Sequence, residues 1–137
     1  MPSKVLVVGS FSKLCYTFTA MLRQRGFEPI SATTVEDARP LLQQDGPALV
    51  ICIAELLDGT YHDILKTTAV TSRPVPVVVI ACKTDDSEYQ RAMALGAADY
   101  VPSSLSPEHA AATIDKAVAL IAGKKSLPRQ LSSQADT

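Results

Sequence analysis

The amino-acid sequence predicts an α/β fold in which helices cover both faces of a parallel β-sheet. Short runs of residues, such as 48–53 and 77–81, are apolar on both strand faces and rich in valine and isoleucine, which is typical of central parallel strands. These runs alternate with amphipathic segments through short connections. The pattern gives five strands and five helices, arranged as a three-layer sandwich with right-handed crossovers.

The composition is that of one globular domain. The chain has 137 residues, of which 47% are hydrophobic, and no apolar run reaches the roughly 18 residues of a membrane span. Its net charge of -1 argues against direct binding to nucleic acid or to an anionic membrane. No signal-peptide pattern is present, and three cysteines, an odd number, favour a reducing cytoplasm over a disulfide framework.

The first expected strand covers residues 4–9. Ser10 or Ser12 can cap the helix that follows it, and Gly26 ends that helix. The apolar face of this helix consists of Leu14, Phe18, Met21 and Leu22.

The second expected strand, residues 27–32, contains Pro29. Proline cannot donate a ladder hydrogen bond, so this strand is expected at an edge of the sheet. Thr33 or Thr34 can cap the next helix, and Pro40 inside that helix is expected to kink it.

The third expected strand runs from residue 48 to Ile53, after a turn at Gly46-Pro47. We expect it to lead into a loop that carries Glu55, Asp58 and Gly59, followed by a helix over 61–70. In open parallel sheets, functional groups lie just past the carboxyl ends of such strands.

The fourth expected strand covers residues 77–81. Thr84 or Asp85 can cap the helix after it, which extends to Leu95 and is closed by Gly96. A short fifth strand over 99–102 completes the sheet.

The last helix begins at Ser106-Pro107 and is expected to end at Gly123. Its expected buried face consists of Ala111, Ile114, Val118 and Ile121. The folded domain therefore covers residues 1–123. Residues 124–137 are polar and without periodicity, which fits either a disordered tail or a linker to a further domain.

Three segments resemble the receiver domain of bacterial two-component response regulators. They are Val5-Leu6-Val7-Val8, Pro47-Ala48-Leu49-Val50-Ile51 and, most specifically, Gly96-Ala97-Ala98-Asp99-Tyr100-Val101. The resemblance covers about residues 4–122 and implies a flavodoxin-like fold with strand order 2-1-3-4-5.

The resemblance also implies a phosphoryl-accepting site, from which this sequence departs at every position. Receivers use an acidic pair after the first strand, an acceptor Asp ending the third, a hydroxyl ending the fourth and a Lys ending the fifth, together with Mg²⁺. These positions here hold Gly9, Ser10, Ile53, Ala81 and Ser103. The sequence therefore predicts a degenerate receiver in which Ile53 cannot be phosphorylated, with no metal, no cofactor and no catalytic residues.

Tyr100 matches the family's switch aromatic, whose ring swings inward on phosphorylation. Without a phosphate, the simpler interpretation is a half-buried strand aromatic packed on the last helix. Both interpretations stay open at this point.

Several other groups have both a chemical and a structural explanation. Glu55, Asp58, Asp85 and Asp86 could hold a cation, although solvated acids and helix caps explain them more simply. Cys52 and Cys82 end neighbouring strands and are expected to be structural thiols rather than a redox pair. The segment 9–13 lacks the glycine spacing of a phosphate loop. His62 and His109 have no partner at metal-ligand spacing.

The expected function is signalling by protein contact without phosphorylation, with a histidine kinase, an output domain or another signalling protein as partner. The face used by receivers for dimers would carry Glu88, Arg91, Tyr100, Glu108 and Lys116, so a homodimer is a second expectation. The alternative is a small-molecule sensor whose ligand lies over the five degenerate site positions.

Overall fold

A five-stranded parallel sheet forms the centre of the molecule, in the order β2-β1-β3-β6-β7. This computed structural model describes residues 3–9, 13–43, 47–69, 75–81, 86–102 and 106–125. The strands are β1 (Lys4–Val8), β2 (Glu28–Ala32), β3 (Leu49–Ile53), β6 (Val77–Ala81) and β7 (Asp99–Pro102). Counted within this sheet alone, the order is 2-1-3-4-5, so the flavodoxin-like fold predicted from the sequence is confirmed.

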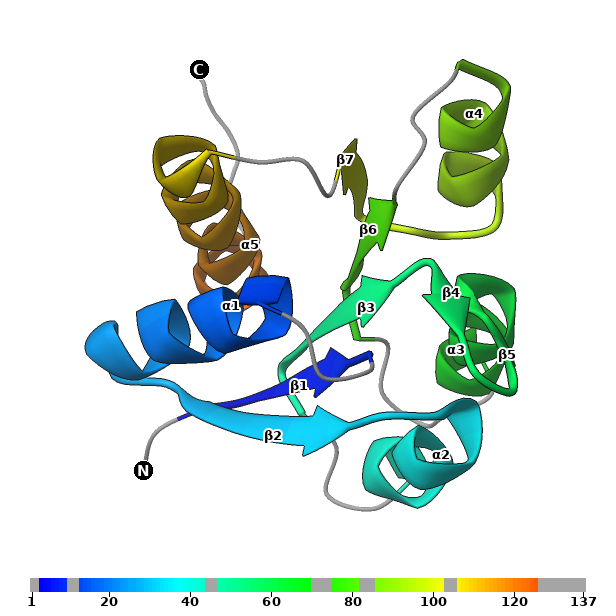
Figure 1. Ribbon diagram of the computed structural model, residues 1–137, viewed down its shortest axis with the longest axis horizontal. Helices are drawn as coiled ribbons and strands as arrows, with labels where there is room; N and C mark the ends of the chain where they lie inside the picture. Colours follow the sequence, from blue (N-terminus) through cyan, green and yellow to red (C-terminus); the bar gives the residue numbers. More distant parts are fainter. Residues whose placement is uncertain are drawn as a thin grey trace.

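Helices cover both faces of the sheet (Figure 1). One face is covered by α1 (Lys13–Gln24) and α5 (Pro107–Lys125), and the other by α2 (Val35–Gln43), α3 (Tyr61–Ala69) and α4 (Asp86–Ala94). Because β1, β3 and β6 lie between two helical layers, their side chains are buried on alternating sides and form two apolar clusters. None of the helices in the described part of the chain has the length and apolarity needed to cross a bilayer.

Local signals in the sequence explain where several helices begin and end. Gly26 and Gly96 have φ values of 83° and 109°, a left-handed conformation that closes α1 and α4. At the start of α2, the hydroxyl of Thr34 accepts a hydrogen bond from the Asp37 amide at 3.0 Å. The hydroxyl of Ser106 caps α5 in the same way, through the His109 amide at 3.2 Å. The expected caps of α1, Ser10 and Ser12, lie outside the described residues.

The expected loop after β3 is wrong, because this segment forms a hairpin. Strands β4 (Glu55–Leu56) and β5 (Gly59–Thr60) pair with each other in antiparallel orientation. Two hydrogen bonds fix the residues on either side of the hairpin: the Ala54 amide donates to the Ile80 carbonyl at 2.8 Å, and the Tyr61 amide donates to the Ala54 carbonyl at 3.0 Å. The connection from β3 to α3 is therefore ordered along its whole length.

The last helix differs from the prediction in its end and in its buried face. It continues past Gly123 to Lys125, since a glycine inside a helix costs only about 1 kcal/mol. Its fully buried residues are Ala110, Ile114, Ala117 and Ile121, whereas Ala111 and Val118 are half-buried. The buried stripe is thus displaced by one residue at two of the four expected positions. Helix α2 likewise continues through Pro40 to Gln43.

Candidate functional site

Gly9, Ile53 and Ala81 lie together at the carboxyl edge of the sheet. Gly9 follows β1, Ile53 ends β3, and Ala81 ends β6. Strands β1 and β3 pair with Val8 opposite Cys52, so the next pair along is Gly9 and Ile53. Strand β3 in turn pairs Ile53 with Ile80 of β6. The other two site positions predicted from the sequence, Ser10 and Ser103, lie outside the described residues.

The side chain of Ile53 occupies the space beside Gly9. A β-carbon added to Gly9 would overlap Cγ1 of Ile53 and would lie 3.2 Å from its Cβ. It would also lie 3.3 Å from Sγ of Cys15 on α1. Position 9 can therefore carry no side chain while Ile53 keeps this rotamer. Ile53 is half-buried and packs against the cluster beneath α1 and α5, so it closes that cluster at the edge.

Ala81 is 3% exposed and belongs to the cluster on the opposite face, together with Tyr61 and Tyr100. Its methyl group offers neither a hydrogen-bond donor nor an acceptor. Gly9, Ile53 and Ala81 thus present apolar groups where the resemblance implies carboxylates and a hydroxyl. Nothing in these three side chains can bind Mg²⁺ or form an aspartyl phosphate.

Tyr100 is 7% exposed, but it does not pack on α5 as expected. It faces the layer of α3 and α4, where its ring makes edge contacts with Tyr61 (centroids 6.1 Å apart) and Tyr89 (6.4 Å). The Tyr61 hydroxyl reaches Glu88 of α4 at 3.5 Å. Burial and the Glu88 carboxylate raise the pKa of Tyr61, so the phenol stays protonated and can donate this bond. The ring of Tyr100 is therefore inward in this structure.

Asp58, at the tip of the β4–β5 hairpin, caps a helix distant in sequence. Its Oδ1 accepts a hydrogen bond from the Val35 amide at 2.8 Å, and its Oδ2 accepts one from the Glu36 amide at 3.1 Å. These are the first two amides of α2, where the helix dipole favours a negative charge. The bond from Val35, followed by that from Glu36, holds the pKa of Asp58 below its usual range. Asp58 thus acts as a helix cap.

The remaining acids do not converge in the part of the chain that the structure describes. Glu55 is exposed on β4, Asp86 is exposed in the first turn of α4, and Asp85 lies outside the described residues. Among residues that are described, no three His, Cys, Asp or Glu side chains lie close enough to hold a metal ion. His62 packs edge-on against Tyr61, with centroids 4.4 Å apart.

Cys52 is fully buried, and desolvation, followed by the proximity of Cys15, raises the pKa of its thiol to about 12. A thiol that stays protonated is a poor nucleophile, so the structural interpretation of Cys52 is the more economical one. Its predicted neighbour Cys82 lies outside the described residues.

The expected interface residues differ in their accessibility. Glu88 is half-buried and lies 3.7 Å from Arg91 in an ion pair within α4. Glu108 and Lys116 are exposed on α5, and Lys116 lines a groove of about 360 Å³ between α5 and β7, together with His109. Tyr100 is buried beneath this face and contributes to its shape rather than to its surface.

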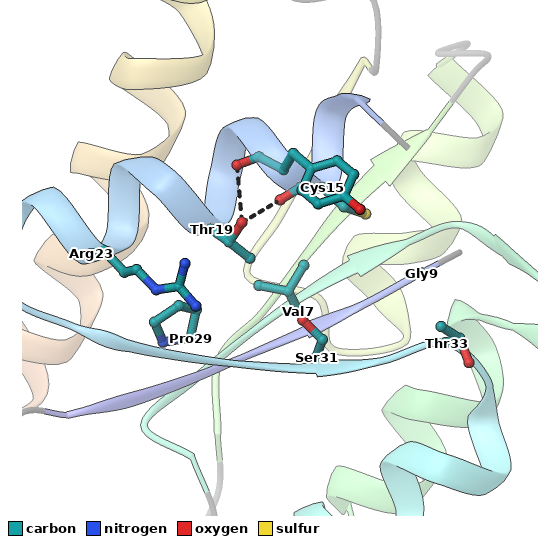
Figure 2. A pocket seen from close by; sticks show the side chains of 9 residues that line it. Val7, Gly9, Cys15, Thr19, Arg23, Pro29, Ser31 and Thr33 are labelled. Carbon is teal, nitrogen blue, oxygen red and sulfur yellow. Dashed lines mark hydrogen bonds between the residues drawn. The ribbon is translucent and has the colours of Figure 1, made fainter. Parts of the chain in front are cut away.

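A cavity of about 170 Å³ opens between α1 and the edge strand β2 (Figure 2). Of the five degenerate site positions, it touches Gly9 alone among those described. Its other described lining residues are Val7, Cys15, Tyr16, Thr19, Arg23, Pro29, Ser31 and Thr33. Sequence reasoning did not identify this cavity, because its walls come from alternate residues of β2 and from one stripe of α1.

Comparisons with known proteins agree with the fold. No protein-family model matches the sequence. The chain is 30% identical over 117 residues to the phosphate regulon transcriptional regulatory protein PhoB of Klebsiella pneumoniae, an alignment that covers 83% of this chain and 51% of that protein. PhoB of Escherichia coli is 29% identical over the same length. The chain thus spans about half the length of the curated relatives that it matches.

Solved structures show the same architecture. The receiver domain of HemR from Leptospira biflexa has a TM-score of 0.77 and 22% identity, with 96% of this chain and 99% of that chain covered. The chemotaxis response regulator CheY4 of Vibrio cholerae has a TM-score of 0.77 and 19% identity, with 85% and 99% covered. At these identities the likeness shows the fold alone. Together with the similarity to PhoB, it supports a response regulator receiver domain.

Proposed function

We propose that this receiver-like domain acts in two-component signalling without being phosphorylated, through contacts with other proteins. The observation that carries the proposal is the contact between Ile53 and Gly9. Ile53 is a branched apolar residue at the position that the resemblance assigns to the acceptor, and its side chain leaves no room for a side chain at Gly9, which the resemblance assigns to the metal-binding acids. The proposal includes no catalytic activity and assigns the domain to the cytoplasm.

The proposed partners are a histidine kinase, an output domain or another signalling protein, and a second copy of the chain. The face made by α4, β7 and α5 is proposed as the contact surface. The inward position of Tyr100, supported by Tyr61 and Tyr89, favours a single fixed shape for this face. A domain whose contact surface does not depend on a phosphoryl group could signal through abundance or through a partner's state.

The test is a phosphorylation assay with Mg²⁺ and acetyl phosphate, read by intact-protein mass spectrometry. We expect no gain of a phosphoryl group, whereas a receiver that has the acceptor aspartate is labelled in parallel. The variant Ile53→Asp is also expected to stay unlabelled, because the acids that bind the metal are missing at Gly9 and Ser10. A base-labile, Mg²⁺-dependent adduct on the wild-type protein would refute the proposal. Labelling of Ile53→Asp would show that other acids, such as Glu55, can replace the missing pair.

A further inference from the structure

The cavity between α1 and β2 has a definite origin in the sequence. The side chains of Pro29 and Ser31 in β2, and of Thr33 just after it, face α1, whereas Ile30 and Ala32 face the opposite cluster. Tyr16, Thr19 and Arg23 form one stripe of α1, at spacings of three and four residues. The wall residues of β2 are small, and Gly9 adds no side chain, so α1 leaves part of this sheet face uncovered.

The polar groups of the cavity suit an anion. Its described lining has one cation, Arg23, and no carboxylate. The guanidinium group of Arg23 forms no hydrogen bond or ion pair with another residue that the structure describes. Figure 2 shows its side chain beside Pro29, on the Ser31 side of the cavity rather than the Thr33 side. Ser31 is exposed, so its hydroxyl can donate a second hydrogen bond to the same group.

The hydroxyls of the two lining threonines, Thr19 and Thr33, have their donor hydrogens engaged. Thr19 donates to the carbonyls of Cys15 at 3.1 Å and Tyr16 at 2.9 Å within α1. Thr33 lies toward the far end of the cavity and donates to Asp37 at 3.2 Å. The middle of the cavity is formed by Val7 and Thr19, so the cavity has a charged end and a largely apolar body.

The cavity fits a small molecule better than an added peptide strand. In β2, the Glu28 amide donates to Ser3 at 2.9 Å, and the Ala32 carbonyl accepts from Gly9 at 2.8 Å. Even-numbered residues of β2 therefore pair with β1, and odd-numbered residues direct their backbone groups outward. Pro29 has no N–H to offer at that outer edge, which leaves the amide of Ser31. A peptide strand added along this edge would therefore form too few backbone hydrogen bonds with β2 to pair stably.

We propose that this cavity binds a small organic carboxylate with a ring-sized apolar body. The carboxylate would pair with Arg23 and the Ser31 hydroxyl, and the ring would lie over Val7 beside Tyr16. The volume of about 170 Å³ is sufficient, since an apolar cavity of about 150 Å³ holds benzene. Such a ligand would contact Gly9, the glycine that accommodates Ile53, and so would lie next to the carboxyl edge of the sheet.

The test is an NMR titration of the ¹⁵N-labelled full chain with benzoate, and with benzamide as the neutral analogue of the same shape. Benzoate is expected to shift the amides of Gly9, Thr19 and Ser31 saturably in the millimolar range, and benzamide to bind more weakly. Arg23→Gln should weaken benzoate binding by about fivefold, the upper value for an exposed ion pair. Thr19→Leu fills the cavity and should abolish binding. Lys66→Gln removes one exposed positive charge on α3 and should leave binding unchanged.

Three results would overturn the proposal. One is the absence of saturable shifts at the cavity amides of the wild-type protein. Another is equal binding of benzoate and benzamide, which would remove the role of the charge. The third is an equal effect of Arg23→Gln and Lys66→Gln, which would reduce the interaction to net charge. The spectrum of each variant without ligand reports whether its fold is intact.

Discussion

Gly9 and Ile53 are complementary in volume, because the side chain of Ile53 occupies the space that a side chain at position 9 would need. A β-carbon on Gly9 would overlap Cγ1 of Ile53, so the isoleucine fills the space that the glycine leaves. The branched side chain at position 53 and the absence of a side chain at position 9 are therefore one packing arrangement. Replacing either residue alone by an acid leaves the other without a carboxylate.

This complementarity can be measured with a double-mutant cycle. Gly9→Ala should reduce the free energy of unfolding by about 1–3 kcal/mol, because its β-carbon overlaps Cγ1 of Ile53. In an Ile53→Ala background, the same change should cost clearly less, because the overlap with Cγ1 is removed while the close contacts with Cβ of residue 53 (3.2 Å) and Sγ of Cys15 (3.3 Å) remain, and alanine also restricts the unfolded chain. Urea denaturation of the four proteins gives the coupling energy.

Leu42→Ala supplies the matched background for that cycle. Leu42 is buried on α2, in the cluster on the other face of the sheet. Gly9→Ala should cost as much there as in the wild-type protein, because distant sites add. Equal costs in the Ile53→Ala and Leu42→Ala backgrounds would contradict the direct contact.

At the scale of elements, the β4–β5 hairpin links β3, α2 and α3. Asp58 at its tip caps α2, and the Asp63 carboxylate of α3 accepts a hydrogen bond from the Thr60 amide at 3.1 Å. The β3–α3 connection is in this way attached to two helices. These hydrogen bonds restrict the movement of the connection relative to α2 and α3.

The cap predicts a specific pH dependence. Asp58→Asn should lower the urea midpoint at pH 7, because the carboxylate stabilises α2 through two amides. The pKa of Asp58 is lowered on folding, so its stabilisation is complete above the unfolded value near 3.8 and is lost as pH falls through the folded value. The midpoints of wild type and Asp58→Asn should therefore converge below pH 3.8.

Asp37→Asn serves as the comparison for this measurement, because Asp37 is an exposed acid of the same helix. Its midpoint difference from wild type should be smaller at pH 7. A difference for Asp58→Asn that stays constant down to acid pH would mean that the charge does not contribute to the cap.

The sequence predicts the sheet well and the connections poorly, for physical reasons. Val77–Ala81 coincides with its predicted range because an apolar run with β-branched residues specifies a buried parallel strand locally. The hairpin was missed because each of its strands has two residues, too few for a periodic pattern. The packing of Tyr100 on α5 is predicted wrongly, because alternation along a strand separates two faces without saying which helices cover each. The sequence shows that residue 53 is apolar, but its contact with Gly9 depends on the register between β1 and β3.

At the scale of the whole molecule, exposed apolar side chains gather on and beside α4. Tyr89, Met93 and Leu95 are 45%, 37% and 48% exposed, and Tyr89 and Met93 lie one helical turn apart. Strand β7 beside them is an edge of the sheet, and α5 adds exposed charges of both signs at Glu108 and Lys116. Apolar groups surrounded by mixed charges suit a self-complementary two-fold interface.

The proposed homodimer through α4, β7 and α5 is tested by sedimentation equilibrium with Met93→Glu. A charge placed among Tyr89 and Leu95 should weaken dimerisation by at least about tenfold, which corresponds to about 1.4 kcal/mol. Met93 is sufficiently exposed that the monomer fold should be unaffected.

The control is Leu57→Glu at the hairpin tip, where an 82% exposed leucine lies outside the proposed face. Because both variants replace an exposed apolar side chain with the same acid, they change net charge and surface polarity alike, and a selective effect of Met93→Glu locates the contact on α4. A wild-type protein that stays monomeric would refute the homodimer, and equal weakening by both variants would refute a contact centred on α4.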